Sequence, residues 1–540
     1  MTQRIGPQRS PVPHDSTGES TDLRPRLAGG SRVLSPATAA LAVALAATSL
    51  GAVAFGCGSD SPGSDAPTPP DASSEADTSN VPDAPAPPAN VHAVAGVQKA
   101  TVSWDAVAGA ASYDLYWSPK SGVTRSTGTK VAGLGATTFA HGPLSGGNYY
   151  YVVTATGAGG ESVESAEASA AVNLVAFATS AVGSGNLGSW PDAAGKSGTA
   201  AGDTICQTLA SKAKLAGSFR AWLSDDSNDA YCRVQGLTGK KAQSCGKTAL
   251  PDAAGPWIRM DGAAWAGTLG SITAASYVED VRVPLRYDEN AKVRSTTYLA
   301  TGTYADGTAD PGNCKQWTSA ANTELVAGSG DSYVGAAWGA GSGSTCNAIL
   351  GLVCLETGTG PALPPTVPVA GARKAFVTSV KGTGNLSSWA DAGGMTGIAA
   401  GDAICRARAT GGGLANAAKF KAWLGTKVPQ AAPSARLTTN GPWARTDGIA
   451  LAKDKADLAD GSIATGLNVD EQGHYVPDSF QPLAWTGDSG GPALDTCVDW
   501  TSALPANQGR TGFDLDSIAP WSSAATMSCD RSFRLYCFED

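Results

Sequence analysis

The sequence predicts a multidomain chain in which an all-β module precedes two copies of one disulfide-stabilised domain. The main observation is a cysteine pattern that occurs twice, with 31 and then 7 residues between successive members: Cys314, Cys346 and Cys354, and again Cys497, Cys529 and Cys537. Each trio follows a shared phrase, AAGDTIC ending at Cys206 and AAGDAIC ending at Cys405. Two four-cysteine sets with the same downstream spacing indicate a duplicated domain.

Composition places the chain outside the cytoplasm. Its 540 residues include 67 Gly and 32 Pro, and only 16% of them are charged, which is typical of loop-rich and strand-rich extracellular proteins. Ten of the 11 cysteines lie between Cys206 and Cys537, and an even set at repeated spacing is expected where disulfides persist. The net charge of −9 argues against a nucleic-acid partner.

The remaining cysteine, Cys57, directly follows the apolar stretch 37–56, which has a basic flank at Arg24, Arg26 and Arg32. This arrangement is typical of a secretory signal. The ending Ala54-Phe55-Gly56-Cys57 resembles a bacterial lipobox, so residues 1–57 are expected to be a lipoprotein signal with Cys57 as the lipidation site. The alternative is an ordinary signal peptide with a stray cysteine. Lipidation implies a membrane partner at the outer membrane or cell surface of a Gram-negative bacterium.

Two segments are predicted to be linkers. Residues 58–86 contain almost no large apolar side chains and cannot bury enough surface to fold, so we expect a disordered tether. Residues 358–372 form a proline-rich linker between the two copies of the duplicated domain.

Residues 87–173 contain short alternating runs such as ATVSW at 100–104 and YYYVVTA at 149–155, which are typical of strands. Alternation puts Val102 and Trp104 on one buried face. The segment resembles a fibronectin type III domain in Pro88, Trp104, Tyr113, Leu115, Leu144 and Tyr150. In secreted bacterial proteins such a module usually implies a spacer.

The duplicated domain spans 174–357 and 373–540. Across Phe177–Cys206 and Phe376–Cys405, 19 of 30 positions are identical without a gap. Asp203 is expected to cap a helix that carries Ile205, Cys206 and Leu209 on one face. The FRAWL and FKAWL segments are too short to assign to helix or strand. Eight of the 14 tryptophans occupy paired positions, which favours a framework role over ligand stacking.

Both copies resemble the endostatin-type domain and a group of uncharacterised bacterial lipoproteins, on the residues GD and C at 202–206, FRAWLS at 219–224, W-x-R-x-D-G at 257–262 and WTS at 317–319. The resemblance implies two α+β C-type-lectin-like domains. It also implies nested disulfides, Cys206–Cys354 around Cys314–Cys346 and Cys405–Cys537 around Cys497–Cys529. Cys232 and Cys245 have no counterpart in the second copy and should then pair with each other.

One segment, GDSGGP at 487–492, spells the sequence around the nucleophile of trypsin-like proteases. A triad needs a histidine base and an orienting carboxylate. Of the four histidines, His14, His92 and His141 lie in the signal or fibronectin-like regions, and His474 lacks the protease context. The segment also aligns with a turn before Cys314 in the first copy. We therefore predict no catalytic residues and no enzyme activity.

Metal and cofactor sites are poorly supported. The acidic turn with Asp225, Asp226 and Asp229 is a weak calcium candidate, and a solvated turn is the favoured alternative. Gln481-Pro482-Leu483 lacks the carboxylate that sugar-binding lectins of the implied fold use for calcium. We expect no cofactor, and the sequence does not identify ligand-binding residues.

The leading functional hypothesis is a surface-anchored, non-catalytic binding or adhesion protein. It would present two lectin-like heads to an extracellular glycan or protein, and two weak heads on one tether would gain effective concentration. The alternatives are a secreted polysaccharide-acting enzyme and a purely structural envelope lipoprotein. For the enzyme, the carboxylates Asp261 and Asp447 occupy equivalent places, but in different copies and not within one site.

Overall fold

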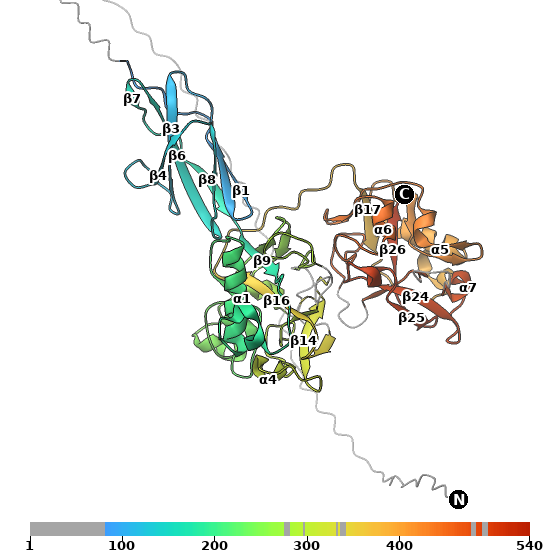
Figure 1. The fold of residues 1–540 in the computed structure, drawn as a ribbon. Coiled ribbons are helices and arrows are strands. Elements are labelled where there is room, and N and C mark those ends of the chain that lie inside the picture. Colours follow the sequence, from blue (N-terminus) through green and yellow to red (C-terminus); the bar gives the residue numbers. More distant parts are fainter. Residues whose placement is uncertain are drawn as a thin grey trace, which may run out of the picture. The chain divides into compact units, whose positions relative to one another are not determined.

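The computed structural model (Figure 1) describes residues 82–274, 281–294, 298–330, 333–334, 338, 342–476, 482–488 and 495–540. The predicted signal, Cys57 and most of the predicted tether lie outside these residues. Within them, three bodies of regular structure follow one another: a β-sandwich and two copies of a mixed α+β domain, here called the first repeat (174–357) and the second repeat (373–540).

The sandwich consists of two antiparallel sheets. One has the order β1-β2-β5, and the other has β4-β3-β6, with β7 and β8 both paired to β6. The strands are β1 (His92–Gly96), β2 (Lys99–Ser103), β3 (Ala110–Ser118), β4 (Thr129–Leu134), β5 (Thr138–His141), β6 (Gly147–Gly157), β7 (Gly160–Glu161) and β8 (Ala168–Val172). Val102 and Trp104 are buried, as their alternation predicts, and the Trp104 ring meets the Tyr113 ring edge-on at 5.5 Å.

A tyrosine next to Tyr150 fixes the start of β6. The tyrosine that ties the start of β6 to the preceding loop is Tyr149, whose hydroxyl donates to the Ser145 carbonyl at 3.1 Å. Tyr150 lies on the opposite side of the strand, because neighbouring residues of a strand face opposite ways. Three consecutive tyrosines hide this choice in the sequence.

The two repeats share one topology. Their sheets have the orders β12-β11-β9-β16-β13-β14-β15 and β22-β21-β17-β26-β23-β24-β25, with β10 and β18 added to the central β16 and β26. The first repeat contains β9 (Leu174–Ala178), β10 (Phe219–Ala221), β11 (Trp257–Arg259), β12 (Ala264–Ala266), β13 (Tyr298–Ala300), β14 (Leu325–Gly330), β15 (Ser342–Thr345) and β16 (Leu350–Glu356), with α1 (Gly198–Lys212), α2 (Ala230–Arg233), α3 (Leu269–Ile272), α4 (Cys314–Trp317), η1 (Leu187–Ser189), η2 (Pro191–Ala193) and η3 (Lys241–Gly246).

The second repeat contains β17 (Arg373–Val377), β18 (Phe420–Ala422), β19 (Thr426–Lys427), β20 (Gln430–Ala431), β21 (Trp443–Arg445), β22 (Ala450–Ala452), β23 (Leu483–Trp485), β24 (Gln508–Phe513), β25 (Ala525–Ser528) and β26 (Arg534–Glu539), with α5 (Gly397–Gly411), α6 (Lys455–Ala459), α7 (Cys497–Trp500), η6 (Leu386–Ser388), η7 (Ala390–Ala392), η8 (Ala417–Lys419), η9 (Pro433–Arg436) and η10 (Ala519–Trp521). The strand orders of the two repeats therefore correspond one to one.

Helix α1 forms where the apolar spacing predicts it, and it buries Ile205, Cys206 and Leu209. The predicted cap is wrong, because the helix begins at Gly198 and Asp203 lies inside it. Asp203 instead accepts a hydrogen bond from the Ala221 backbone N–H at 3.1 Å and pairs with Arg233 at 2.8 Å. Its carboxylate fastens the helix to β10. The first three residues of the FRAWL segment, Phe219–Ala221, form this strand and pair with β16.

Five disulfide bonds are present: Cys206–Cys354, Cys232–Cys245, Cys314–Cys346, Cys405–Cys537 and Cys497–Cys529. They join the cysteines that the family resemblance pairs. In each repeat one bond ties the long helix to the central strand, and a second ties a short turn to the segment after the edge strand; Cys232–Cys245 is a third bond in the first repeat. The Cys206–Cys354 and Cys405–Cys537 bonds each join residues more than 100 positions apart in the sequence.

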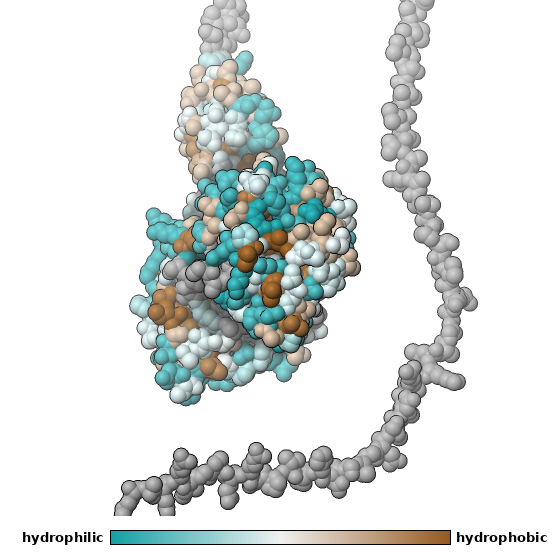
Figure 2. All heavy atoms as spheres, turned by 90° about the vertical axis from the view of Figure 1, so that its right-hand side faces the viewer, coloured by the Kyte–Doolittle hydropathy of each residue, from teal (hydrophilic) through white to brown (hydrophobic). Residues whose placement is uncertain are grey.

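The surface that faces the viewer in Figure 2 carries small groups of apolar residues among polar ones, without one continuous apolar patch. No helix within the described residues is long and apolar enough to cross a membrane. On this face a ligand site therefore has to be sought in a hollow, since large apolar patches are the usual sign of a flat interface.

Candidate functional site

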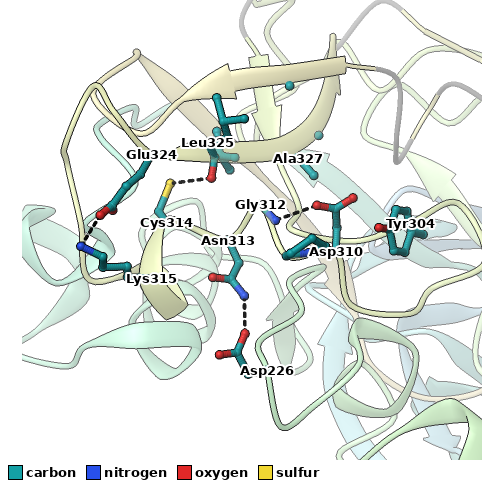
Figure 3. A pocket seen from close by; sticks show the side chains of 14 residues that line it. Asp226, Tyr304, Asp310, Gly312, Asn313, Cys314, Lys315, Glu324, Leu325 and Ala327 are labelled. Atoms are coloured by element: carbon teal, nitrogen blue, oxygen red, sulfur yellow. Dashed lines mark hydrogen bonds and ion pairs between the residues drawn. The ribbon is translucent and has the colours of Figure 1, made fainter. Parts of the chain in front are cut away.

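The first repeat carries a groove between β14 and the loop that precedes α4 (Figure 3). Its volume is about 850 Å³, within the range of small-molecule sites. Residues from three separate parts of the sequence line it, including Asp226, Tyr304, Asp310, Asn313, Glu324 and Leu325. The groove combines an exposed aromatic ring, an exposed aliphatic side chain and several carboxylates.

One wall of the groove is the turn α4, whose backbone is left-handed. Cys314, Lys315, Gln316 and Trp317 have φ values of 51°, 50°, 57° and 64°, a conformation that costs roughly 1–2 kcal/mol for each residue with a β-carbon. The Cys314–Cys346 bond and the buried Trp317, whose indole N–H donates to the Ser224 carbonyl at 2.7 Å, hold this turn in place. The second repeat has the same left-handed turn at Cys497–Trp500, so this strain belongs to the fold.

Tyr304 lies on a tight loop at one end of the groove. Its backbone N–H donates to the Thr308 carbonyl at 2.8 Å, and its carbonyl accepts from Gly307 at 2.9 Å. Tyr304 is 47% exposed. Figure 3 shows its hydroxyl pointing toward Asp310, and this hydroxyl has no hydrogen-bond partner within the described part of the chain.

Asp310 uses one of its two carboxylate oxygens. Oδ1 accepts from the Gly312 backbone N–H at 2.7 Å, and Oδ2 has no partner among the described residues. The Tyr304 hydroxyl and Asp310 Oδ2 are therefore available to a ligand at the same end of the groove.

The three weak calcium candidates, Asp225, Asp226 and Asp229, do not lie on one surface: two are buried and one reaches the groove. Asp225 and Asp229 are buried, and backbone N–H groups bind both: Asn228 donates to Asp225 at 2.8 Å, and Lys241 donates to Asp229 at 2.7 Å. Asp226 reaches the groove and accepts from Asn313 at 2.8 Å and from Gln316 at 3.1 Å. No group of three or more His, Cys, Asp or Glu residues in the described ranges is placed to hold a metal ion.

The groove carries an excess of negative charge. Asp226, Asp310 and Glu324 are set against a single ammonium, that of Lys315, which pairs with Glu324. The hydrogen bond from Lys315 lowers the pKa of Glu324, which keeps this carboxylate ionised. The ammonium is thus engaged, and two further carboxylates remain uncompensated by a cation within the lining.

The corresponding surface of the second repeat differs in charge and in the length of one loop. Strands β14 and β24 align without a gap, so Arg510 replaces Ala327 and Thr511 replaces Gly328. Their backbones are alike: Ala327 N–H donates to Gly312 at 2.7 Å, and Arg510 N–H donates to Asp495 at 2.8 Å. Lys427 takes the place of Asp226, and the loop that carries Tyr304 is two residues shorter.

The protease-like segment is only partly described. Gly487 has a φ of 62°, and Asp488 accepts from the Ser522 hydroxyl at 2.6 Å. Ser489 to Pro492 lie outside the described residues, as does Gln481 of the lectin-like triplet. His474 is largely exposed, and its nearest carboxylate is Asp470 at 3.9 Å. The described residues do not bring a histidine and a carboxylate together around this segment in the way a triad requires.

Asp261 and Asp447, the carboxylates that the enzyme alternative singled out, are engaged by arginines. Arg259 and Arg445 each donate twice to the aspartate two residues on, with shortest distances of 2.7 and 2.6 Å. Burial acts to raise the pKa of Asp447, but the charge and hydrogen bonds of Arg445 outweigh it and lower the pKa. A general acid needs the opposite shift.

A tyrosine covers each of these arginines, and sequence comparison missed it. Tyr287 lies 4.6 Å from Arg259, and Tyr475 lies 5.2 Å from Arg445. Each repeat has a short antiparallel bridge here, Tyr287 with Val293 in the first repeat and Val469 with Tyr475 in the second. The tyrosine is therefore the first member of the bridge in the first repeat and the second member in the second repeat. A tyrosine and a valine have exchanged places across the pair, a change that column-by-column alignment does not reveal.

The strand pairing of the sandwich settles its type. Three strands, β1, β2 and β5, face β4, β3, β6 and β8, with the tyrosine corner at Tyr149, an arrangement found in two-sheet immunoglobulin-like modules. The sandwich is fibronectin type III-like. Solved structures similar to this fibronectin-like domain include an Fn3-like protein from Clostridium thermocellum, with 33% identity, 17% of this chain and 94% of that chain covered and a TM-score of 0.15.

A second similar structure is a β-1,2-glucanase from Parabacteroides distasonis, with 25% identity over 17% of this chain and 12% of that chain and a TM-score of 0.14. A third, FN3tt, has 22% identity, covers 16% of this chain and 95% of that chain and has a TM-score of 0.15. No protein-family model and no curated protein sequence matches the chain.

Proposed function

We propose that this chain is a surface-anchored, non-catalytic binding or adhesion protein whose repeats are C-type-lectin-like domains. A lipid on Cys57 would hold it at an outer membrane, residues 58–86 would act as a tether, and the fibronectin-like domain would act as a spacer. Five disulfides within two small domains support an oxidising location.

The observation that carries the proposal is the groove of the first repeat. It offers the half-exposed Tyr304 in a hollow of about 850 Å³, together with a Tyr304 hydroxyl and an Asp310 oxygen that have no partner among the described residues. A ring-shaped, hydroxyl-rich ligand fits this combination, because its flat face packs on the aromatic ring while its hydroxyls bond to the polar groups. We therefore place a glycan in this groove.

A binding screen with matched variants tests the proposal. Soluble protein beginning at Gly58 is expected to bind members of a glycan array, and Tyr304→Ala is expected to weaken that binding at least tenfold. Leu504→Ala, which removes another exposed apolar side chain, in the second repeat, is the control and should leave binding unchanged. Absence of binding to every glycan, or equal binding by Tyr304→Ala, would rule out this site.

A further inference from the structure

The groove of the first repeat has a charge that restricts its ligand. Three carboxylates and one engaged ammonium line it, so an anionic sugar would meet repulsion and a cationic one attraction. Resting on the proposed function above, we propose that the groove binds a cationic sugar, with the chemistry of an unacetylated amino-sugar unit in a polysaccharide.

The free groups in the groove suit this chemistry. Asp310 Oδ2 has no partner in the described chain and can accept a charge-assisted hydrogen bond from a ligand ammonium, which is stronger than a bond between neutral groups. The Tyr304 ring at the same end offers an apolar face to the sugar and an electron-rich face to the ammonium. The exposed Leu325 side chain lies on β14, nearer Cys314 and Glu324.

The second repeat provides a natural contrast. At positions equivalent to Ala327 and Asp226 it carries Arg510 and Lys427, and at the position of Leu325 it carries Gln508. A cation would therefore meet Arg510 and Lys427 on the same surface of the second repeat, where the carboxylate of Asp499 accepts from the Lys427 backbone N–H at 2.6 Å and that of Asp495 accepts from the Thr526 hydroxyl at 3.1 Å. The proposal accordingly includes a stoichiometry of one ligand site per chain, in the first repeat.

Titration calorimetry on the soluble protein from Gly58, at about pH 6, tests both parts. The probes are fully deacetylated and fully N-acetylated oligomers of glucosamine, a neutral glucan oligomer and an oligolysine. The deacetylated oligomer is expected to bind at one site. Its affinity should fall at least tenfold between about 0.05 and 0.5 M NaCl, because salt screens exposed charges.

Three variants localise the site. Asp310→Asn keeps the acceptor for Gly312 but removes the charge, and should weaken binding at least tenfold. Ala327→Arg introduces the residue of the second repeat and should abolish binding. Asp460→Asn is the matched control, because Asp460 also accepts from the backbone N–H two residues on, at 2.9 Å, in the second repeat, and it should bind like the wild type.

The outcomes separate the two proposals. Equal affinity for the N-acetylated and deacetylated oligomers, unchanged by Asp310→Asn but lost in Tyr304→Ala, would overturn the cationic ligand and leave a glycan site. Two sites per chain would overturn the contrast between the repeats. Oligolysine binding as tightly as the deacetylated oligomer would assign the groove to basic peptides. If none of these sugars binds while the glycan array is positive, only the cationic ligand is overturned; if the array is negative as well, both proposals fail.

Discussion

Burial shifts the pKa values of two side chains, Glu356 and His141, in opposite directions. Glu356, at the end of β16, is buried and accepts hydrogen bonds from the backbone N–H groups of Gly146 at 2.8 Å and Val175 at 3.0 Å. Burial raises its pKa to about 7, against the partial opposing effect of these bonds. His141, at the end of β5, has its ring 4.4 Å from the Trp117 ring, and burial lowers its pKa.

The raised pKa of Glu356 predicts a loss of stability as pH rises. The folded state holds the proton up to about pH 7 and the unfolded state releases it near pH 4.5, so the free energy of unfolding falls between these values, by about 3 kcal/mol at most. Denaturant unfolding from pH 4.5 to 8 should show this slope, and Glu356→Gln should remove it. Glu539→Gln, at the same place in the second repeat, should retain it.

The lowered pKa of His141 predicts the opposite slope for the sandwich. Below about pH 6.5 the unfolded state takes up a proton that the folded state resists. The free energy of unfolding therefore falls on acidification. His141→Phe should make sandwich unfolding less dependent on pH between 5 and 7, whereas exposed His92→Phe should not. An unchanged slope in His141→Phe would show that another group is responsible.

At the scale of elements, the spacing of apolar residues correctly predicted those elements whose buried face is set by their own sequence. The apolar face of α1 and the buried face of β2 follow from periodicity. The left-handed turns at Cys314 and Cys497 do not, because their residues have no glycine and the conformation is held by tertiary contacts. The groove could not be predicted either, because it joins Asp226, the 304–315 segment and β14, which lie far apart in the sequence.

A fifth pair of equivalent tryptophans, Trp338 and Trp521, was also missed, because the sequence around it is poorly conserved between the repeats. The Trp338 ring contacts the Trp222 ring, and the Trp521 ring contacts the Trp423 ring, with the same interplanar angle of 38°.

The Cys232–Cys245 bond is the element that distinguishes the first repeat. It closes a segment with a sequence separation of 13, for which the chain-entropy model gives about 3 kcal/mol. Replacing both cysteines with alanine should lower the free energy of unfolding of the first repeat by about this amount. Differential scanning calorimetry should show the transition of the second repeat unmoved. Movement of both transitions would mean that the repeats unfold as one unit.

At the scale of the whole molecule, the duplication has kept the framework and changed the surface. Strand order, two disulfides per repeat and the left-handed turn recur. The groove wall changes from Ala327 to Arg510 on a backbone that makes the same hydrogen bond. This pattern is expected when one copy retains a ligand site and the other is free to diverge, and it reduces the role of avidity between two equal heads.

Under the proposed function, anchoring of the chain at a surface would depend on lipidation of Cys57. If Cys57 is lipidated, the full-length chain should enter the detergent phase on phase separation, because each buried methylene contributes about 0.8 kcal/mol and two chains give stable anchoring. Cys57→Ser should move the protein to the aqueous phase or leave it unprocessed, which intact mass distinguishes. Protein secreted from Gly58 behind an unrelated signal is the aqueous reference. Aqueous partition of the wild type would instead indicate an ordinary signal peptide, and the protein would then reach its ligand in free solution.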